Sequence, residues 1–139
     1  MSEALKALAR REVEMFSTGN FDIADEIYSE DYVGHDPTKP EAIRGIEGAK
    51  EEAAGYRAAF PDLTLTIDHQ VAEGEYVVTR WTARGTHEGD LAGIAPTGKS
   101  ATTSGISMVR VVDGKIVEDF TQWDALGLMT QLGVVPAMA

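Results

Sequence analysis

The first sixty residues carry apolar side chains at helical spacing. A first helix is predicted from an apolar stripe of Leu5, Leu8, Val13 and Phe16, whose spacing is close to three and four residues. Gly19 is expected to end this helix. A shorter stripe follows Asp22, which is placed to cap it, and predicts a second helix through Tyr28. Tyr32-Val33 then predicts a brief strand, closed by turn residues at 35–38. The N-terminal part of the chain is therefore expected to be mainly helical.

A third helix is predicted between Arg44-Gly45 and Pro61. Its apolar stripe consists of Ile46, Ala49, Ala53, Tyr56 and Phe60. The intervening charged residues are expected on the opposite, polar face: Glu47, Lys50, Glu51, Glu52 and Arg57. Pro61-Asp62 ends this helix because proline cannot continue it. Such a one-sided helix is typical of one that covers a sheet.

After Asp62 the pattern changes to alternation, which is typical of half-buried strands. Strands are predicted over 63–71, 77–86, 100–112 and 116–123, and Asp113-Gly114 is a strong two-residue hairpin turn. A short helix with Leu126, Met129 and Leu132 closes the pattern. Helices followed by an antiparallel meander indicate an α+β protein. With 139 residues, a single domain over 1–139 is expected.

The segment Gly85–Gly98 interrupts two of these strands with four glycines, a proline and His87. Glycine reaches backbone angles closed to other residues, and proline fixes one dihedral, so the connection has a specified shape. A long connection beside a rigid scaffold is a common place for binding groups. We therefore expect this loop to carry binding groups.

Composition narrows the functional classes. The formal net charge of -11 disfavours binding to nucleic acid, because phosphate backbones would be repelled. No cysteine is present, which removes disulfides and thiolate chemistry. The charged N-terminus lacks the apolar core of a signal peptide, and no run approaches the ~20 apolar residues of a membrane span. The chain is expected in the cytoplasm, with no membrane partner.

Cofactor motifs are missing as well. The sequence holds no phosphate-binding loop, no dinucleotide glycine fingerprint and no serine nucleophile elbow. Its three histidines are widely spaced, and no two have the spacing of metal ligands on a helix or strand. We therefore expect no metal and no organic cofactor.

Asp124 is the first candidate for acid/base chemistry. Counting back by two from it along an unbulged strand gives Gln122, Phe120, Glu118 and Ile116 on one face. A carboxylate at the end of such a face, beside aromatic surface, would lose hydration, and its pKa would rise. Asp124 also precedes a predicted helix, where it would serve as an N-cap. Capping is favoured by spacing alone, and the two roles are compatible.

Two histidines are further candidates for proton transfer or hydrogen bonding. His87 ends the second long strand, where its alternative role is to hold the glycine-rich backbone. His35 follows the first strand beside Asp36, which would orient the imidazole or simply stabilise a turn. His69 shares the apolar parity of its strand with Ile67 and is interpreted as a core or pocket-wall residue.

Several large or unusual side chains are candidates for a pocket wall. Those expected to contact a hydrophobic ligand are Trp81, Met108, Arg110, Phe120 and Gln122. Arg110 stands alone among apolar neighbours, so it meets an anionic ligand or, as the favoured interpretation, pairs with a carboxylate such as Glu118 on the adjacent strand. The expected ligand is a hydrophobic small molecule.

Taken together, the chain resembles the SnoaL-like polyketide cyclases (ester cyclases) of the nuclear transport factor two-like superfamily. The resemblance runs through Phe60-Pro61-Asp62-Leu63, Gly85-Thr86-His87, Pro96-Thr97-Gly98, the stretch from Asp113 to Glu118, and Gln131-Leu132-Gly133. It implies a cone, also called cystatin-like, in which helices pack on a strongly curved antiparallel sheet around an internal cavity. A homodimer is also expected from the family.

The resemblance further implies an intramolecular aldol condensation, or a related isomerisation, that needs no cofactor. An aspartate near the end of the last strand would be the acid/base, and Asp124 stands at that place, assisted by His35 and His87. Members often have Glu-His-Trp after the hairpin, whereas this chain has Glu118-Asp119-Phe120, so its histidine is missing. That departure alters the aromatic wall of the pocket.

Two alternatives stay open. Epoxide hydrolysis on the same fold would require an arginine two residues before an aspartate, but Arg110 is followed by Val111-Val112. A non-catalytic ligand-binding or dimerising module is the second alternative. It would use the third long strand's expected outer face for a contact between sheets, with Thr103, Ser107, Val109 and Val111.

Overall fold

The fold comes from a computed structural model that describes residues 2–135. Its helices are α1 (Ser2–Thr18), α2 (Ile23–Ile27), α3 (Gly45–Ala59) and α4 (Ala125–Leu132). Its strands are β1 (Tyr28–His35), β2 (Ile43–Arg44), β3 (Thr64–Glu73), β4 (Tyr76–Thr86), β5 (Ser100–Val112) and β6 (Lys115–Trp123). The α+β class is confirmed. The second helix ends one residue earlier than predicted, and the first strand is longer, because extended backbone begins at Tyr28.

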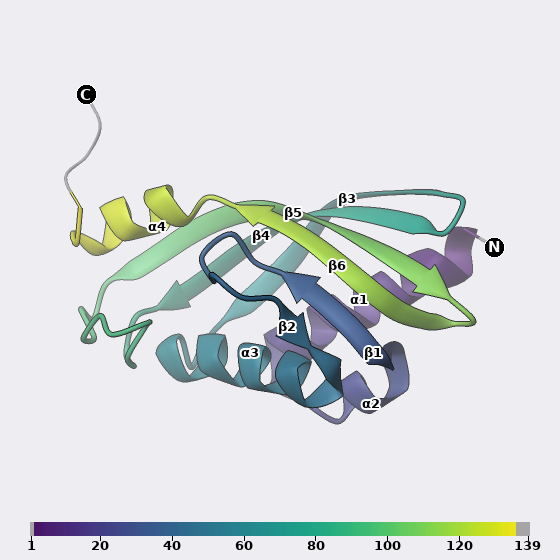
Figure 1. The fold of residues 1–139 in the computed structure, drawn as a ribbon. Coiled ribbons are helices and arrows are strands. Elements are labelled where there is room, and N and C mark those ends of the chain that lie inside the picture. Colours follow the sequence, from purple (N-terminus) through teal and green to yellow (C-terminus); the bar gives the residue numbers. More distant parts are fainter. Residues whose placement is uncertain (1, 136–139) are drawn as a thin grey trace.

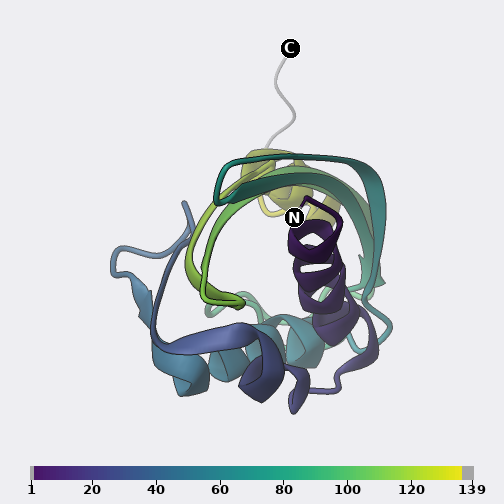
Figure 2. The same cartoon turned by 90° about the vertical axis from the view of Figure 1, so that its right-hand side faces the viewer.

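All the strands belong to one six-stranded sheet with the order β2-β1-β6-β5-β4-β3. The sheet is strongly curved, and α1 lies inside its concave side while α3 lies across the opposite opening (Figures 1 and 2). The expectation of a purely antiparallel sheet is wrong at one place, since β1 pairs with β6 in parallel. These two strands are far apart in the sequence, so no hairpin constrains their direction, and a parallel pair needs only a long connection.

A β-bulge in β6 decides which side chains face the interior. Arg110 pairs with Glu118, but Val111 pairs with Ile116, so Val117 is an extra residue in β6. An extra residue shifts the alternation by one. Beyond the bulge, Asp119, Thr121 and Trp123 line the concave side, and the residues between them face the convex side.

A second bulge lies in β3 at Asp68, because Ile67 pairs with Trp81 whereas His69 pairs with Arg80. It turns His69 outward, where its side chain is exposed. The interpretation of His69 as a core or pocket-wall residue is therefore wrong. Gln70 takes the inward place and donates hydrogen bonds to the Lys6 carbonyl and to Thr79.

The glycine-rich connection lies against the C-terminal end of α3. The backbone N–H groups of Glu88 and Gly89 both donate to the carbonyl of Ala59, at 3.0 and 3.1 Å. A Cβ at Gly89 would overlap the carbonyl oxygen of Ala58, so only glycine allows this approach. The loop is closed on itself by hydrogen bonds between His87 and Lys99 and between Gly98 and His87. The glycine at this position of the sequence is therefore required for the contact between the loop and α3.

The apolar core has two parts, one at each end of the sheet. The first joins α1, α2 and α3 to the sheet through residues such as Met15, Ile23, Ile27, Val109 and Ile116. The second lies near α4 and the long loop, with Ala59, Phe60, Leu91, Leu128 and Leu132. No helix within residues 2–135 is long and apolar enough to cross a membrane.

Candidate active site

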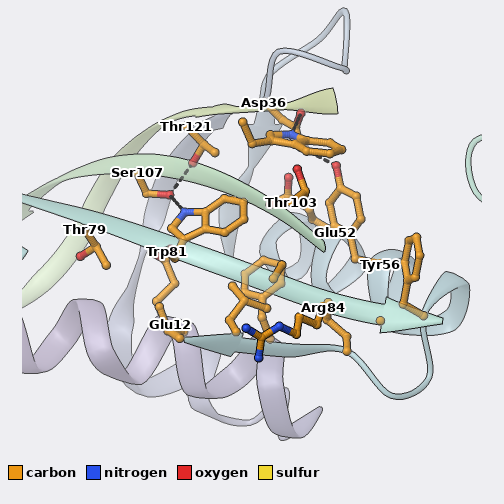
Figure 3. Close-up of a pocket in the computed structure, with 18 of the residues that line it drawn as sticks. Glu12, Asp36, Glu52, Tyr56, Thr79, Trp81, Arg84, Thr103, Ser107 and Thr121 are labelled. Atoms are coloured by element: carbon orange, nitrogen blue, oxygen red, sulfur yellow. Dashed lines mark hydrogen bonds between the residues drawn. The ribbon is translucent and has the colours of Figure 1, made fainter. Parts of the chain in front are cut away.

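A cavity of about 130 Å³ is lined by residues of the sheet, α1 and α3. Its wall is mainly apolar, with the indoles of Trp81 and Trp123 and the ring of Phe60. Four acidic side chains also line it: Glu12 from α1, Asp36 from the turn after β1, Glu52 from α3 and Asp119 from β6. Figure 3 labels the first three. An apolar cavity that gathers several titratable groups is a candidate for an active site.

Asp36 is a fixed anion on one side of this cavity. Its Oδ2 accepts a hydrogen bond from the Tyr56 hydroxyl at 2.6 Å, and its Oδ1 accepts from Trp123 Nε1 at 3.1 Å. Oδ1 also accepts from the backbone and hydroxyl of Thr38, at 2.9 and 2.7 Å. Burial raises its pKa, but these donors outweigh burial, so the pKa of Asp36 falls well below its ordinary value. Asp36 is thus ionised at neutral pH.

Glu52 has the opposite balance. Its side chain is only 15% exposed, and burial together with the charge of Asp36 raises its pKa to about 8. Lys39 opposes this rise from the rim, where its Nζ lies 3.8 Å from Glu52 Oε2 and 3.5 Å from Asp36 Oδ2. A carboxyl group with a pKa near neutrality is able to both take and return a proton.

Glu12 and Asp119 form a buried pair of carboxyl groups. Glu12 Oε2 accepts a hydrogen bond from the Tyr28 hydroxyl at 2.6 Å, and Glu12 is hydrogen-bonded to Asp119. Burial raises the pKa of both carboxyls, most of all that of Asp119, which lies beside the charge of Glu12. Burial and the closeness of the two carboxyls therefore both oppose their ionisation.

A row of hydrogen bonds crosses the sheet between Trp81 and this pair. Figure 3 shows its part from Trp81 to Thr121. Trp81 Nε1 lies 3.1 Å from Ser107 Oγ, and Ser107 Oγ lies 2.9 Å from Thr121 Oγ1. Thr121 donates to Asp119 Oδ1 at 2.8 Å. Because these residues come from β4, β5 and β6, the row ties together the three strands that form the cavity wall.

Asp124 does not reach the cavity. It follows β6 on the convex side and lies in a shallow depression with Arg80 and Gln122. Its Oδ1 accepts a hydrogen bond from the backbone N–H of Gly127 at 2.8 Å, which makes it the N-cap of α4. The capping interpretation is confirmed, while the expected place on a cavity face is wrong because the bulge at Val117 shifts the alternation.

The two candidate histidines also lie outside the cavity lining. His35 Nε2 is 2.8 Å from Glu118 Oε2, and its ring stacks on Phe120 with 5.0 Å between centroids. His87 is fully buried beneath the glycine-rich loop. The Thr97 backbone N–H donates to His87 Nδ1 at 3.2 Å, so the other ring nitrogen carries the proton. His87 thus binds the backbone of the glycine-rich loop, which was the alternative to a role in proton transfer.

Of the residues expected to contact a ligand, Trp81 lines the cavity. The others lie away from it, on the convex side: Met108, Arg110, Phe120 and Gln122. Phe120 is 38% exposed. Arg110 forms the expected ion pair, but its partner is Glu75, with 2.9 Å between Nε and Oε1, not Glu118. The same alternation places Thr103, Ser107 and Val109 in the cavity wall and Val111 in the core, so that face of β5 is not the outer one.

Two of the four cavity carboxylates, Glu12 and Glu52, interrupt an apolar pattern, and that interruption is a sequence signal. Glu12 lies four residues after Leu8 and three before Met15, in the apolar stripe of α1. Glu52, which was assigned to a polar face, lies three residues after Ala49 and four before Tyr56. Asp119 became recognisable only with the bulge. Within residues 2–135 no cluster of three or more histidines and acids has the arrangement of a metal site.

The curved sheet, the cavity on its concave side and the acidic side chains of that cavity define a cone-shaped α+β protein. A sequence model described as SnoaL-like polyketide cyclase matches residues 6–132. The chain belongs to the SnoaL-like polyketide cyclase family. The resemblance drawn from the sequence is thereby confirmed.

Named relatives are cyclases. The chain is 33% identical over 133 residues to aklanonic acid methyl ester cyclase DnrD of Streptomyces peucetius, covering 91% of this chain and 88% of that protein. It is 33% identical to the crystal structure of IdmH, a putative polyketide cyclase from Streptomyces antibioticus, with a TM-score of 0.79 over 93% of this chain and 98% of that one. A putative SnoaL-like polyketide cyclase from Jannaschia sp. CCS1, 22% identical, shares the fold with a TM-score of 0.88 over 98% of this chain and 96% of that one. Relatives and family support cyclase-type catalysis.

Proposed function

We propose that this protein is a cofactor-independent cyclase that closes a ring in a hydrophobic carbonyl compound by intramolecular aldol condensation, with Glu52 as the acid/base. The observation that carries the proposal is the position of Glu52, a carboxyl group in an apolar cavity beside the fixed anion Asp36. Its pKa of about 8 is closer to that of an activated carbon acid than an ordinary carboxylate would be.

The reaction balances with one proton and no other reagent. Ionised Glu52 takes a proton from the carbon next to a carbonyl group, and the resulting enolate carbon attacks a second carbonyl of the same molecule. A carbon–carbon bond forms, the second C=O π bond breaks, and the new alkoxide takes the proton back from Glu52. The apolar wall and the two indoles supply orientation, which lowers the entropic cost of ring closure.

Asp36 and Lys39 position this group. The hydrogen bonds from Tyr56, Thr38 and Trp123 hold Asp36 as a charge that keeps Glu52 protonated in the resting protein. Lys39 contacts both carboxylates and lies over the Tyr56 ring, 4.5 Å from its centroid. Lys39 stabilises the ionised form of Glu52, which is the form that takes the proton from the substrate.

Substitution of Glu52 tests the proposal. With aklanonic acid methyl ester as the probe, we expect Glu52→Gln to lower turnover by about 10²- to 10⁴-fold, the usual contribution of general acid/base catalysis. Since aldol closure leaves the mass unchanged, the product is separated by chromatography and identified by NMR. Glu51→Gln is the matched control, because Glu51 is the exposed neighbour on the same helix.

The outcomes separate the alternatives. Full turnover by Glu52→Gln would contradict its role, and loss of turnover in Asp124→Asn alone would favour the sequence-based prediction for Asp124. The positions of Asp124, His35 and His87 outside the cavity lining favour Glu52 as the acid/base. Tight binding of the probe with no conversion by the native protein would favour the non-catalytic binding module.

A homodimer and a cytoplasmic location remain parts of the proposal. Both rest on the sequence and the family, and light scattering of the purified protein tests the first. A monomeric mass at micromolar concentration would contradict the homodimer.

A further inference from the structure

We propose that Ser107 and Thr121 form a subsite that accepts a hydrogen bond from a ligand hydroxyl, so that the cavity selects hydroxyaryl compounds over the corresponding ethers. The inference deepens the proposed function and rests on it only in using the same cavity as the ligand site. The inference rests on which atoms donate and which accept in the hydrogen bonds of the cavity wall. These roles follow from the chemical groups that take part.

The indole of Trp81 sets the direction at one end of the row. An indole N–H donates and cannot accept, so Ser107 Oγ is the acceptor of the 3.1 Å contact with Trp81 Nε1. The hydroxyl of Ser107 must therefore direct its single hydrogen elsewhere. Thr121 Oγ1, at 2.9 Å, is its hydrogen-bonding neighbour across the strand.

Asp119 sets the direction at the other end. Thr121 donates its single hydrogen to Asp119 Oδ1 at 2.8 Å, so it accepts from Ser107. The row thus runs one way, from Trp81 through Ser107 and Thr121 to Asp119. Both hydroxyl hydrogens are used within the protein, and only oxygen lone pairs remain for a ligand.

Three other donors of the cavity lining are also used within the protein. The Tyr56 hydroxyl and Trp123 Nε1 both donate to Asp36, and the Thr103 hydroxyl donates to the Asp124 carbonyl at 3.0 Å. A ligand hydroxyl beside Ser107 would gain an acceptor, whereas an ether oxygen there would face lone pairs with no donor. The Trp81 ring next to this point offers apolar surface to a flat aromatic ring.

A matched pair of probes tests this polarity. 2-Naphthol and 2-methoxynaphthalene share one aromatic skeleton and differ in the hydroxyl hydrogen. We expect isothermal titration calorimetry at pH 6.5 to show that the native protein binds the naphthol about tenfold more tightly, the effect of one hydrogen bond with its partner left unsatisfied in the ether. Equal binding of the two, or binding of neither, would overturn the inference.

Two variants distinguish the direction of the hydrogen bonds from shape complementarity as the cause of the preference. Thr121→Val, a change of similar shape, removes the acceptor for Ser107 and frees its hydrogen, so the tenfold preference should fall to about twofold or less. Ser107→Ala frees the Trp81 N–H to donate, so the preference should move toward the ether. If both variants fold, as judged by circular dichroism, and keep the native ratio, the inference fails.

Thr103→Val is the matched control, because it removes a cavity-lining hydroxyl that lies outside the row. Its ratio of the two dissociation constants should stay within about twofold of the native value. A fall as large as that of Thr121→Val would also overturn the inference. Since only binding is measured, a preference for naphthol without any turnover would remove the proposed reaction and leave the subsite intact.

Discussion

At the scale of single residues, the cavity shows how environment separates chemically similar groups. Asp36 is ionised because four hydrogen bonds reach its carboxylate. Glu52, next to it, stays protonated at neutral pH because it is buried beside that charge. Such a pair, with pKa values pushed apart, assigns one carboxyl to positioning and the other to proton transfer.

Asp124 gives a residue-scale prediction about stability. Asp124→Ala should lower the free energy of unfolding by about 1 kcal/mol, because the N–H of Gly127 loses its cap. Asp124→Asn should be close to native, since asparagine caps equally well. Urea denaturation followed by circular dichroism measures both. Equal destabilisation by the two variants would contradict a simple capping role.

At the scale of elements, sequence predicted the strands and helices better than their faces. The alternation from Ile116 to Asp124 was counted through an unbulged strand, and one extra residue at Val117 exchanged the two faces. Trp81 was placed correctly because β4 keeps its alternation from Val77 to Gly85. Bulges depend on pairing with a neighbouring strand, so single-strand periodicity does not reveal them.

Gly105 in β5 gives an element-scale prediction. A Cβ there would lie 2.5 Å from Trp81 Cζ2 and 2.8 Å from the Gln122 carbonyl oxygen, and backbone cannot move aside easily. We expect Gly105→Ala to destabilise the protein by about 1–3 kcal/mol and to displace the Trp81 indole. Thermal melts and near-ultraviolet circular dichroism measure these two effects.

Gly55→Ala is the control for that substitution. Gly55 lies inside α3 and has no atom within 4 Å of an added Cβ. Alanine should stabilise the helix there by about 0.5–1 kcal/mol. A Gly105→Ala variant as stable as Gly55→Ala would show that the wall around Trp81 adapts without cost.

At the scale of the whole molecule, the family resemblance supplied what periodicity did not. The pattern indicated helices and an antiparallel meander, but curvature and an enclosed cavity came only with the resemblance. The acidic lining depends on α1, α3 and β6 meeting in three dimensions, which separations of 40 and 67 residues along the chain do not reveal. Tertiary packing therefore decides which acids of this acidic chain enter the interior.

That packing predicts an unusual dependence of stability on pH. Glu52 has a pKa of about 8 in the folded protein and an ordinary value of 4.5, so between these values the folded state binds more protons than the unfolded state. Stability then falls as pH rises from about 4.5 to 8, and burial of Glu12 and Asp119 acts in the same direction. Asp36 has the opposite sign, but its contribution is lost only below its ordinary value of 3.8.

Urea denaturation across this range measures the effect. We expect the native protein to lose about 2–4 kcal/mol of unfolding free energy between pH 5 and pH 8. Glu52→Gln should show a smaller loss, because glutamine does not ionise, while Glu51→Gln should follow the native curve. Repulsion within a chain of net charge -11 also weakens the fold as pH rises, but salt screens it. A loss that persists in 0.5 M salt and shrinks in Glu52→Gln belongs to the buried carboxyl, and a flat native curve would contradict the raised pKa of Glu52 on which the proposed chemistry rests.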